Sequence, residues 1–208
     1  MHDTTSPHDL LWGMTPAQLP VGAPGWAHEV LNAGQPVVVR RAMVASGQIA
    51  VGLRGNSRDQ RYAAVMPACA VQRKVRPEQL VERLRAAELP ALRALAQLKP
   101  ILDALGLGWG VTGSVGYELA TGLPKAHADS DLDLLLRTPA ELSRTSAREV
   151  RLLLDAAPCH VDMQLETPSG AVALREWAGD SARVLLKCSS GARLVGNPWS
   201  LDQAELAA

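Results

Sequence analysis

The sequence of 208 residues has few cysteines, no net charge and no long apolar run. It has three cysteines, an odd number, and no two of them have the sequence spacing of a metal site. Neither a disulfide framework nor a zinc site is therefore expected. Equal numbers of basic and acidic residues, 21 each, argue against binding DNA or an anionic membrane through overall charge. The apolar runs are too short to span a bilayer, and residues 1–11 lack the apolar segment of a secretory signal. We therefore expect a cytoplasmic enzyme or binding module that contacts neither nucleic acid nor membrane.

Lysine is also scarce. Only four of the 21 basic residues are Lys, which leaves 17 Arg. The planar guanidinium group suits phosphate oxygens, although a GC-rich genome favours Arg as well, so the excess alone leaves both explanations open. Hydrophobic residues make up 47% of the chain, which is enough to build a packed core.

The pattern of turns and apolar runs predicts two domains. Residues 1–36 contain five prolines, with short helices expected at residue 15 and over 26–31. Strands are expected over 37–41, 49–53 and 62–66. Residues 1–76 are therefore predicted to form a small β-rich N-terminal domain.

Residues 77–208 are predicted to form an α+β catalytic domain. Helices are expected over 79–87 and 90–98, through 105, and over 115–121 and 141–156. The last of these should bury Leu142, Val150, Leu153 and Leu154. Strands are expected over 109–112, 132–136 and 161–165, with short strands and glycine turns over 171–196.

Two carboxylates mark the start of one predicted strand. Asp131 and Asp133 are two positions apart, so on a strand they project from the same face, about 6–7 Å apart at Cα. Two carboxylates that face one cleft repel each other unless a cation lies between them, which suits Mg²⁺, with Mn²⁺ as the alternative. Asp162, on the polar side of the strand over 161–165, supplies a third carboxylate if the two strands are neighbours, enough for two metal ions.

A phosphate site is predicted where the strand over 109–112 ends. Gly113 allows close approach of the backbone, and the N–H groups of the following helix, with the Ser114 hydroxyl, form an anion site. Lys125 supplies further positive charge. In the N-terminal domain, Arg54, Arg58 and Arg61 are candidates to bind substrate; the alternative is that they are solvated surface arginines.

These pieces occur in a recognisable order. Gly113-Ser114 is followed by 16 residues (115–130), by Asp131-Leu132-Asp133, and by the later strand that contains Asp162. This order resembles the nucleotidyltransferase superfamily, which includes the polymerase-beta-like enzymes. The resemblance implies a nucleotidyltransferase-like mixed sheet with helices.

Further segments narrow the resemblance. The chain is similar, over nearly its whole length, to the phosphoribosyl-dephospho-CoA transferase family of malonate decarboxylase. The segments that carry this similarity are 8–12, 36–41, 51–55 with Arg58 and Arg61, Gly113-Ser114, 130–134, 160–162 and Asn197-Pro198-Trp199.

The resemblance implies transfer of a prosthetic group from 2'-(5''-triphosphoribosyl)-3'-dephospho-CoA to a serine of the apo acyl-carrier subunit of malonate decarboxylase, with release of pyrophosphate. It casts Asp131 and Asp133 as metal ligands, Ser114 as a phosphate contact and Asp162 as the group that activates the serine hydroxyl. Two alternatives remain open: a nucleotidyltransferase that uses ATP, and a non-catalytic binding module of the same fold.

Overall fold

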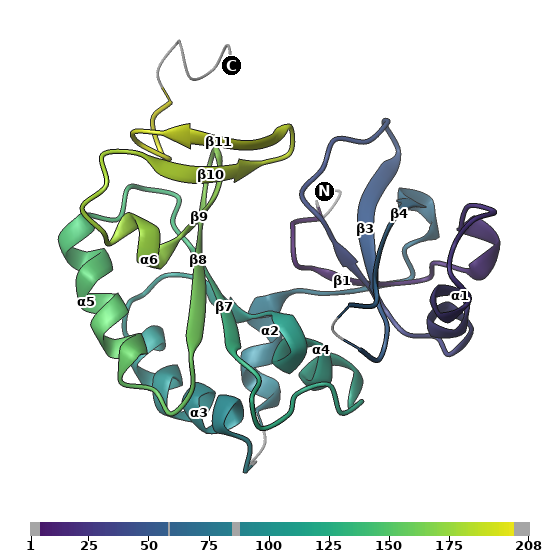
Figure 1. Cartoon of the computed structure of the whole chain (residues 1–208), viewed down its shortest axis with the longest axis horizontal. Helices are drawn as coiled ribbons and strands as arrows, with labels where there is room; N and C mark the ends of the chain where they lie inside the picture. The colour runs from purple at the N-terminus through teal and green to yellow at the C-terminus, as the bar shows by residue number, and fades with distance from the viewer. Residues whose placement is uncertain (1–4, 58, 85–87, 202–208) are drawn as a thin grey trace. The chain divides into compact units, whose positions relative to one another are not determined.

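The computed structural model describes residues 5–57, 59–84 and 88–201. The chain forms two compact units, Met1–Arg76 and Pro77–Ala208 (Figure 1). We refer to them as the N-terminal unit and the C-terminal unit.

The N-terminal unit is built on a five-stranded antiparallel sheet with the strand order β4-β3-β2-β1-β5. Its elements in chain order are β1 (Leu10–Trp12), η1 (Pro16–Gln18), α1 (Gly25–Asn32), β2 (Val37–Val39), β3 (Gln48–Arg54), β4 (Arg61–Pro67), η2 (Ala68–Ala70) and β5 (Arg73–Val75). The three expected strands and both short helices are present. The strands β1 and β5 were not predicted from the sequence.

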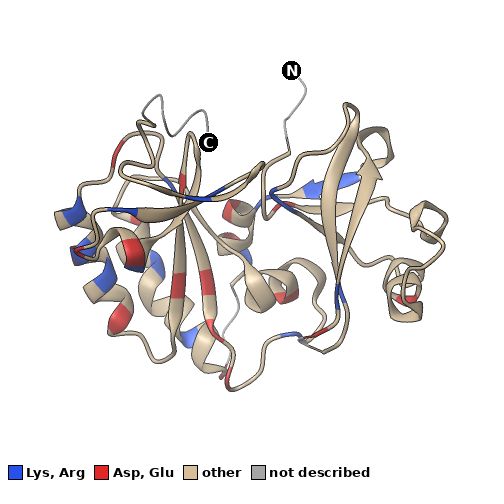
Figure 2. Ribbon diagram, turned by 45° about the horizontal axis from the view of Figure 1, so that its top comes forward, with Lys and Arg blue, Asp and Glu red and all other residues tan. Residues whose placement is uncertain are grey.

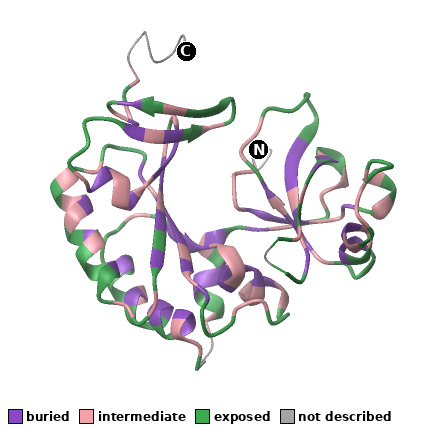
Figure 3. Cartoon of the chain, viewed as in Figure 1, coloured by how far each residue is buried: buried purple, intermediate pink, exposed green. Residues whose placement is uncertain are grey.

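One face of this sheet packs against α1. Alternate residues of the strands are buried there, including Leu11, Val37, Val51 and Met66, together with Ala27 of α1. Burial alternates along β4 as expected for a strand with one buried face (Figure 3). Burial of this apolar face against α1 holds the unit together.

The C-terminal unit contains a six-stranded mixed sheet with the order β11-β10-β9-β8-β7-β6. Only the pair β7–β8 is parallel, and the other neighbours are antiparallel. The elements are α2 (Pro77–Leu80), η3 (Val81–Arg83), α3 (Pro90–Asp103), β6 (Trp109–Val111), α4 (Gly113–Thr121), β7 (Leu132–Arg137), α5 (Arg144–Asp155), β8 (Val161–Thr167), β9 (Gly170–Ala173), α6 (Leu174–Trp177), β10 (Val184–Cys188) and β11 (Gly191–Val195). The predicted α+β class is confirmed.

The helix α5 forms the crossover that a parallel strand pair requires. It begins after Ser143, whose side chain accepts a hydrogen bond from the Ser146 N–H, and it buries Ala147, Val150 and Leu154. The prediction of a helix from residue 141 was wrong because the Ser143 cap fixes the start. Burial of Leu153 was also wrong, since that side chain is 42% exposed.

The helix α3 is continuous where a break was predicted after residue 98. It passes through Pro100 and reaches Asp103. Pro100 removes the hydrogen bond to the carbonyl of Ala96, but both residues are exposed, so water can satisfy that carbonyl. Burial of Leu98 and Leu102 on the opposite side of the helix stabilises its last turn. The helix expected over 79–87 is shorter, with α2 followed by η3; residues 85–87 lie outside the described ranges.

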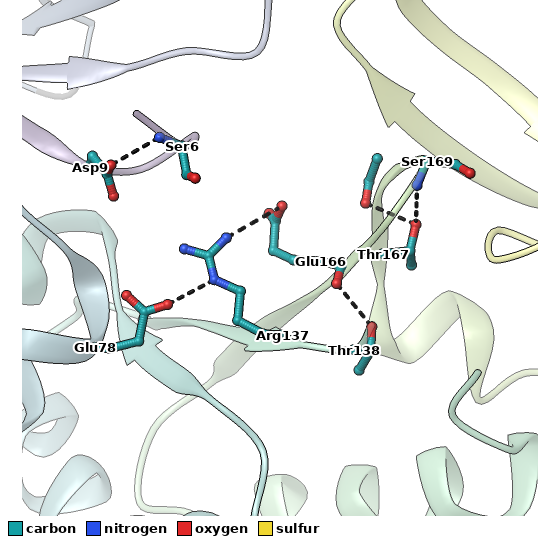
Figure 4. A network of polar contacts seen from close by, with 9 residues as sticks. Ser6, Asp9, Glu78, Arg137, Thr138, Glu166, Thr167 and Ser169 are labelled. Carbon is teal, nitrogen blue, oxygen red and sulfur yellow. Dashed lines mark hydrogen bonds and ion pairs between the residues drawn. The ribbon is translucent and has the colours of Figure 1, made fainter. Parts of the chain in front are cut away.

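Polar contacts tie the far ends of β7 and β8 together. Arg137 donates to Glu78 at 2.7 Å, and its Nη1 lies 3.9 Å from the buried Glu166 (Figure 4). Asn197 and Trp199, from the segment that carried part of the family resemblance, bond Glu141 and the Thr138 carbonyl, each at 2.7 Å. The Asn-Pro-Trp segment is therefore explained by packing against this end of the sheet.

No helix among the described residues is long and apolar enough to cross a membrane.

The difference between two neighbouring leucines of α5 can be tested directly. We expect Leu154→Ala to lower the free energy of unfolding by about 3 kcal/mol, because it leaves a cavity. Leu153→Ala should cost less than about 1 kcal/mol, because that side chain is largely solvated. Urea unfolding followed by circular dichroism measures both, and equal losses would contradict the described orientation of α5.

Candidate active site

The parallel pairing of β7 and β8 brings the predicted carboxylates to one edge of the sheet. Leu132 is paired with Val161, and Asp133 with Asp162. The ladder begins with the Leu132 N–H, which donates to the His160 carbonyl at 2.9 Å. Because both strands start at this edge, the residues at their first positions become neighbours. The sequence did not establish that Asp162 would reach the other aspartates; the register places it directly opposite Asp133.

Asp131, His160 and Asp162 form a compact group. The Asp131 Oδ1 lies 3.6 Å from His160 Nδ1, and the Asp162 Oδ1 lies 3.8 Å from His160 Nε2. One ligand atom of each residue lies within 4.8 Å of the others. All three side chains are about half exposed, so a substrate can reach them.

The donors in this group fit a divalent cation. Carboxylate oxygens are the donors that Mg²⁺ and Mn²⁺ favour, and they are supplied by Asp131, directly before β7, and by Asp162 of β8. The His160 imidazole lies between the two carboxylates, where it can pair with either one. The sequence analysis did not include His160 among the candidate site residues. The sequence does contain an indication of its position. His160 precedes Val161-Asp162 in the same way that Asp131 precedes Leu132-Asp133.

Asp133 lies against Gly113, the first residue of α4, which follows the neighbouring strand β6. A Cβ added at Gly113 would approach the Asp133 Cγ to 2.7 Å and its Cβ to 2.9 Å. Gly113 also has φ +64°, a region that L side chains rarely adopt. The Thr112 N–H donates to the Asp133 carbonyl at 2.9 Å and fixes this contact. The Gly113-Ser114 turn and the carboxylates, predicted as two halves of one site, thus meet at Asp133.

The start of α4 offers hydrogen-bond donors beside Asp133. The first bond of the helix runs from Gly116 N–H to the Thr112 carbonyl, at 2.9 Å. The N–H groups of residues 113–115 precede that bond and have no carbonyl partner within the helix. Thr112 places no side-chain cap on them. This turn therefore has the donor arrangement and dipole orientation that favour an anion.

The loop between α4 and β7 is ordered by two side chains. The Glu118 Oε2 accepts hydrogen bonds from the backbone N–H groups of Lys125 and Ala126, at 2.8 and 2.9 Å. Ser130, which is buried, accepts from the His127 N–H at 3.0 Å. The Lys125 Nζ lies 5.9 Å from the ring centroid of Tyr117. Glu118 and Ser130, which the sequence did not single out as site residues, therefore hold Lys125 close to α4.

Cys159 directly precedes His160. Burial raises the pKa of its thiol and the negative charge of Asp131 acts in the same direction, whereas a hydrogen bond with the Leu132 backbone lowers it. The net pKa lies above the ordinary value, so the thiol is protonated at neutral pH and is not a ready nucleophile.

The predicted arginines belong to the N-terminal unit. Arg54 and Arg61 are directly opposite each other at the end of the β3–β4 hairpin where its loop connects the two strands. Arg58 lies outside the described residues.

Comparisons with known proteins identify the family of this chain. The family model described as Phosphoribosyl-dephospho-CoA transferase MdcG C-terminal domain matches residues 79–198, and the corresponding N-terminal domain model matches residues 6–77. The chain belongs to the phosphoribosyl-dephospho-CoA transferase family. The predicted identification is confirmed, and the protein is a transferase.

Curated relatives of this transferase family align over almost the entire chain. A phosphoribosyl-dephospho-CoA transferase of Pseudomonas fluorescens strain Pf-5 is 64% identical over 194 residues, 93% of either chain. The one of Pseudomonas putida strain W619 is 60% identical over 94% of this chain and 95% of its own. The one of Azotobacter vinelandii strain DJ is 58% identical over 96% of this chain and 98% of its own. No solved structure matches the chain.

The contact between Gly113 and Asp133 generates a prediction with a matched control. Gly113→Ala should reduce transfer about a hundredfold, because the new methyl group displaces the Asp133 carboxylate. Gly106 has a similar φ, +67°, but nothing lies within 4 Å of an added Cβ. Gly106→Ala therefore introduces the same backbone strain without the displacement.

Label transfer and thermal unfolding of the two variants separate these effects. We expect both variants to lose stability through backbone strain, Gly113→Ala the more because Asp133 must move, and a loss of activity only at position 113. Equal activities would show that the position of the Asp133 carboxylate does not matter.

Proposed function

We propose that the protein transfers the 5''-phosphoribosyl-3'-dephospho-CoA group from 2'-(5''-triphosphoribosyl)-3'-dephospho-CoA to a serine of the apo acyl-carrier subunit of malonate decarboxylase, releasing pyrophosphate. Family membership supports the transferred group. The observation that carries the proposal is the meeting of Asp131, Asp133 and Asp162 with the start of α4. Residues 77–208 are then the catalytic domain, and residues 1–76 form an accessory domain.

Phosphoryl transfer requires mainly positioning and neutralisation of charge. In this proposal Asp131 and Asp133 hold Mg²⁺ or Mn²⁺, with Asp162 within reach of the same edge. The bound ion would neutralise charge on the donor phosphates. His160 lies between Asp131 and Asp162, 3.6 and 3.8 Å from their Oδ1 atoms, beside the proposed ion.

The reacting groups come from the two substrates. The serine oxygen of the carrier forms a bond to the phosphorus nearest the ribose, and the bond from that phosphorus to the departing pyrophosphate breaks. The serine proton passes to the Asp162 carboxylate, which is solvent-accessible and returns it to water. The product is a phosphodiester, and no nucleophile of the enzyme is needed.

The start of α4 binds the phosphates that leave. The N–H groups of residues 113–115 and the Ser114 hydroxyl donate hydrogen bonds to phosphate oxygens. Lys125, positioned by Glu118, adds positive charge on the same side of α4. Such donors stabilise the transition state most where their positions are fixed before the substrate binds.

The carboxylates can be tested by isosteric replacement. Asp131→Asn and Asp162→Asn should each lower the transfer rate more than about a hundredfold, because the amide neither balances a cation nor accepts a proton. Asp129→Asn is the control, since that exposed aspartate lies two residues from Asp131. Transfer is measured as the gain in mass of the apo carrier.

Near wild-type turnover in either site variant would reject the proposed roles. Transfer from ATP, and not from the triphosphoribosyl donor, would replace the proposal by a nucleotidyltransferase that uses ATP.

Activity should also depend on a divalent cation. Treatment with EDTA followed by metal-free dialysis should abolish transfer, and Mg²⁺ or Mn²⁺ should restore it. Because the donor phosphates supply part of the coordination, the ion should bind weakly in the absence of donor. A rate that survives metal removal would contradict the assignment of Asp131 and Asp133 as ligands.

A further inference from the structure

The sheet of the N-terminal unit has a second face, opposite α1. Since side chains alternate along a strand, residues between the core positions point to this face. The register aligns Arg54 with Arg61 across β3 and β4, and Trp12 with Arg73 across β1 and β5. All four residues lie on the face that α1 does not cover. Leu10, Ala50 and Val75 of the same face are buried, so only part of it is open to a ligand.

Arg40, which directly follows β2, lies on the same face as these four residues. A Cβ added at Gly52 would lie 3.0 Å from the Arg40 Cδ, so the Arg40 stem crosses Gly52 on the same face. We call Arg40, Arg54, Arg61 and Arg73 the arginine face. None of the five strands contains Asp or Glu, whereas β3, β4 and β5 carry Arg or Lys (Figure 2).

The five strands contribute no carboxylate that could pair with the exposed arginines of this face. Arg40, Arg61 and Arg73 are exposed, and none of them makes an ion pair within the part of the chain that the structure describes. The charges of Arg40, Arg61 and Arg73 are therefore available to an anionic ligand.

The face also carries the side chains common at protein interfaces. The Arg73 guanidinium carbon lies 4.3 Å from the centroid of the half-buried Trp12 ring, which holds the arginine in place. Ala63 and Val65 add exposed apolar surface beside Arg61. Arg and Trp are the residues that contribute most to binding energy at such interfaces.

The separation of the arginines across the sheet indicates what kind of ligand they can bind. From β4 to β5 there are four strand spacings, about 19 Å. Small-molecule sites are concave and enclose their ligand, whereas these arginines are spread across one face of a sheet. Several separated anions on a broad surface match this spacing, as in a protein that bears exposed carboxylates.

We propose that the arginine face docks an acidic surface of the protein that receives the phosphoribosyl-dephospho-CoA group. This inference rests on the proposed function only in naming that protein as the apo acyl-carrier subunit of malonate decarboxylase. Because the whole chain has no net charge, attraction of an acidic partner must come from a local patch. Docking should accelerate association and weaken as salt screens charges beyond about 8 Å.

The test reverses two exposed charges of the face. Arg61→Glu with Arg73→Glu should raise KM for the apo carrier at least about tenfold through like-charge repulsion, with KM for the donor and kcat little changed. Arg93→Glu, an exposed arginine on α3, is the matched control and should behave as wild type. Replacing the same pair by Gln should give an intermediate effect, and circular dichroism checks folding.

Direct binding separates this inference from the proposed function. Apo carrier is immobilised, and association of wild-type and variant protein is measured at low and high salt without donor. Slower association of the variant with Arg61→Glu and Arg73→Glu, together with a weaker dependence of its association rate on salt, supports carrier docking at the arginine face even if transfer itself fails. An unchanged carrier KM and association rate, or a rise confined to the donor KM, would overturn it; wild-type protein that does not bind the carrier would do the same.

Discussion

The in-register parallel pairing of β7 and β8 is the constraint on which the candidate site depends. It places Asp133 opposite Asp162 and brings Asp131 and His160 to the same edge. Because side chains alternate along a strand, a shift of one residue would turn Asp162 toward the core and expose a leucine or valine. Buried Leu132, Leu134, Val161 and Met163 oppose such a shift, so the apolar core also fixes the geometry of the carboxylates.

A second constraint joins the carboxylates to the anion-binding turn. Asp133 occupies the space that a side chain at residue 113 would need, and the left-handed backbone of Gly113 turns the chain from β6 into α4. The same glycine therefore serves the turn and the packing of Asp133, and in the proposed mechanism it also allows a phosphate to approach the helix start. Gly-Ser and Asp-Leu-Asp thus lie in contact although 16 residues (115–130) separate them.

Local patterns predicted much of this arrangement. The strands that carry Asp133 and Asp162 were predicted from their apolar runs and from the alternation of apolar and polar residues. Such alternation is visible in the sequence because a strand with one buried face needs apolar residues at every second position. What local patterns lack is the pairing of strands, so the position of His160 between two carboxylates was missed. The three-residue strands β1 and β5 were missed because distant partners stabilise them. The continuity of α3 through Pro100 likewise depends on tertiary burial of Leu102.

The most direct test of the account is to locate the metal. Crystals of the wild-type protein with Mn²⁺ and the triphosphoribosyl donor, measured for anomalous scattering, would show the ion. The account predicts a peak about 2.0–2.3 Å from carboxylate oxygens of Asp131 and Asp133, with donor phosphate oxygens completing the coordination. A donor-bound crystal with no ion at these aspartates, or with the phosphates away from the start of α4, would contradict it.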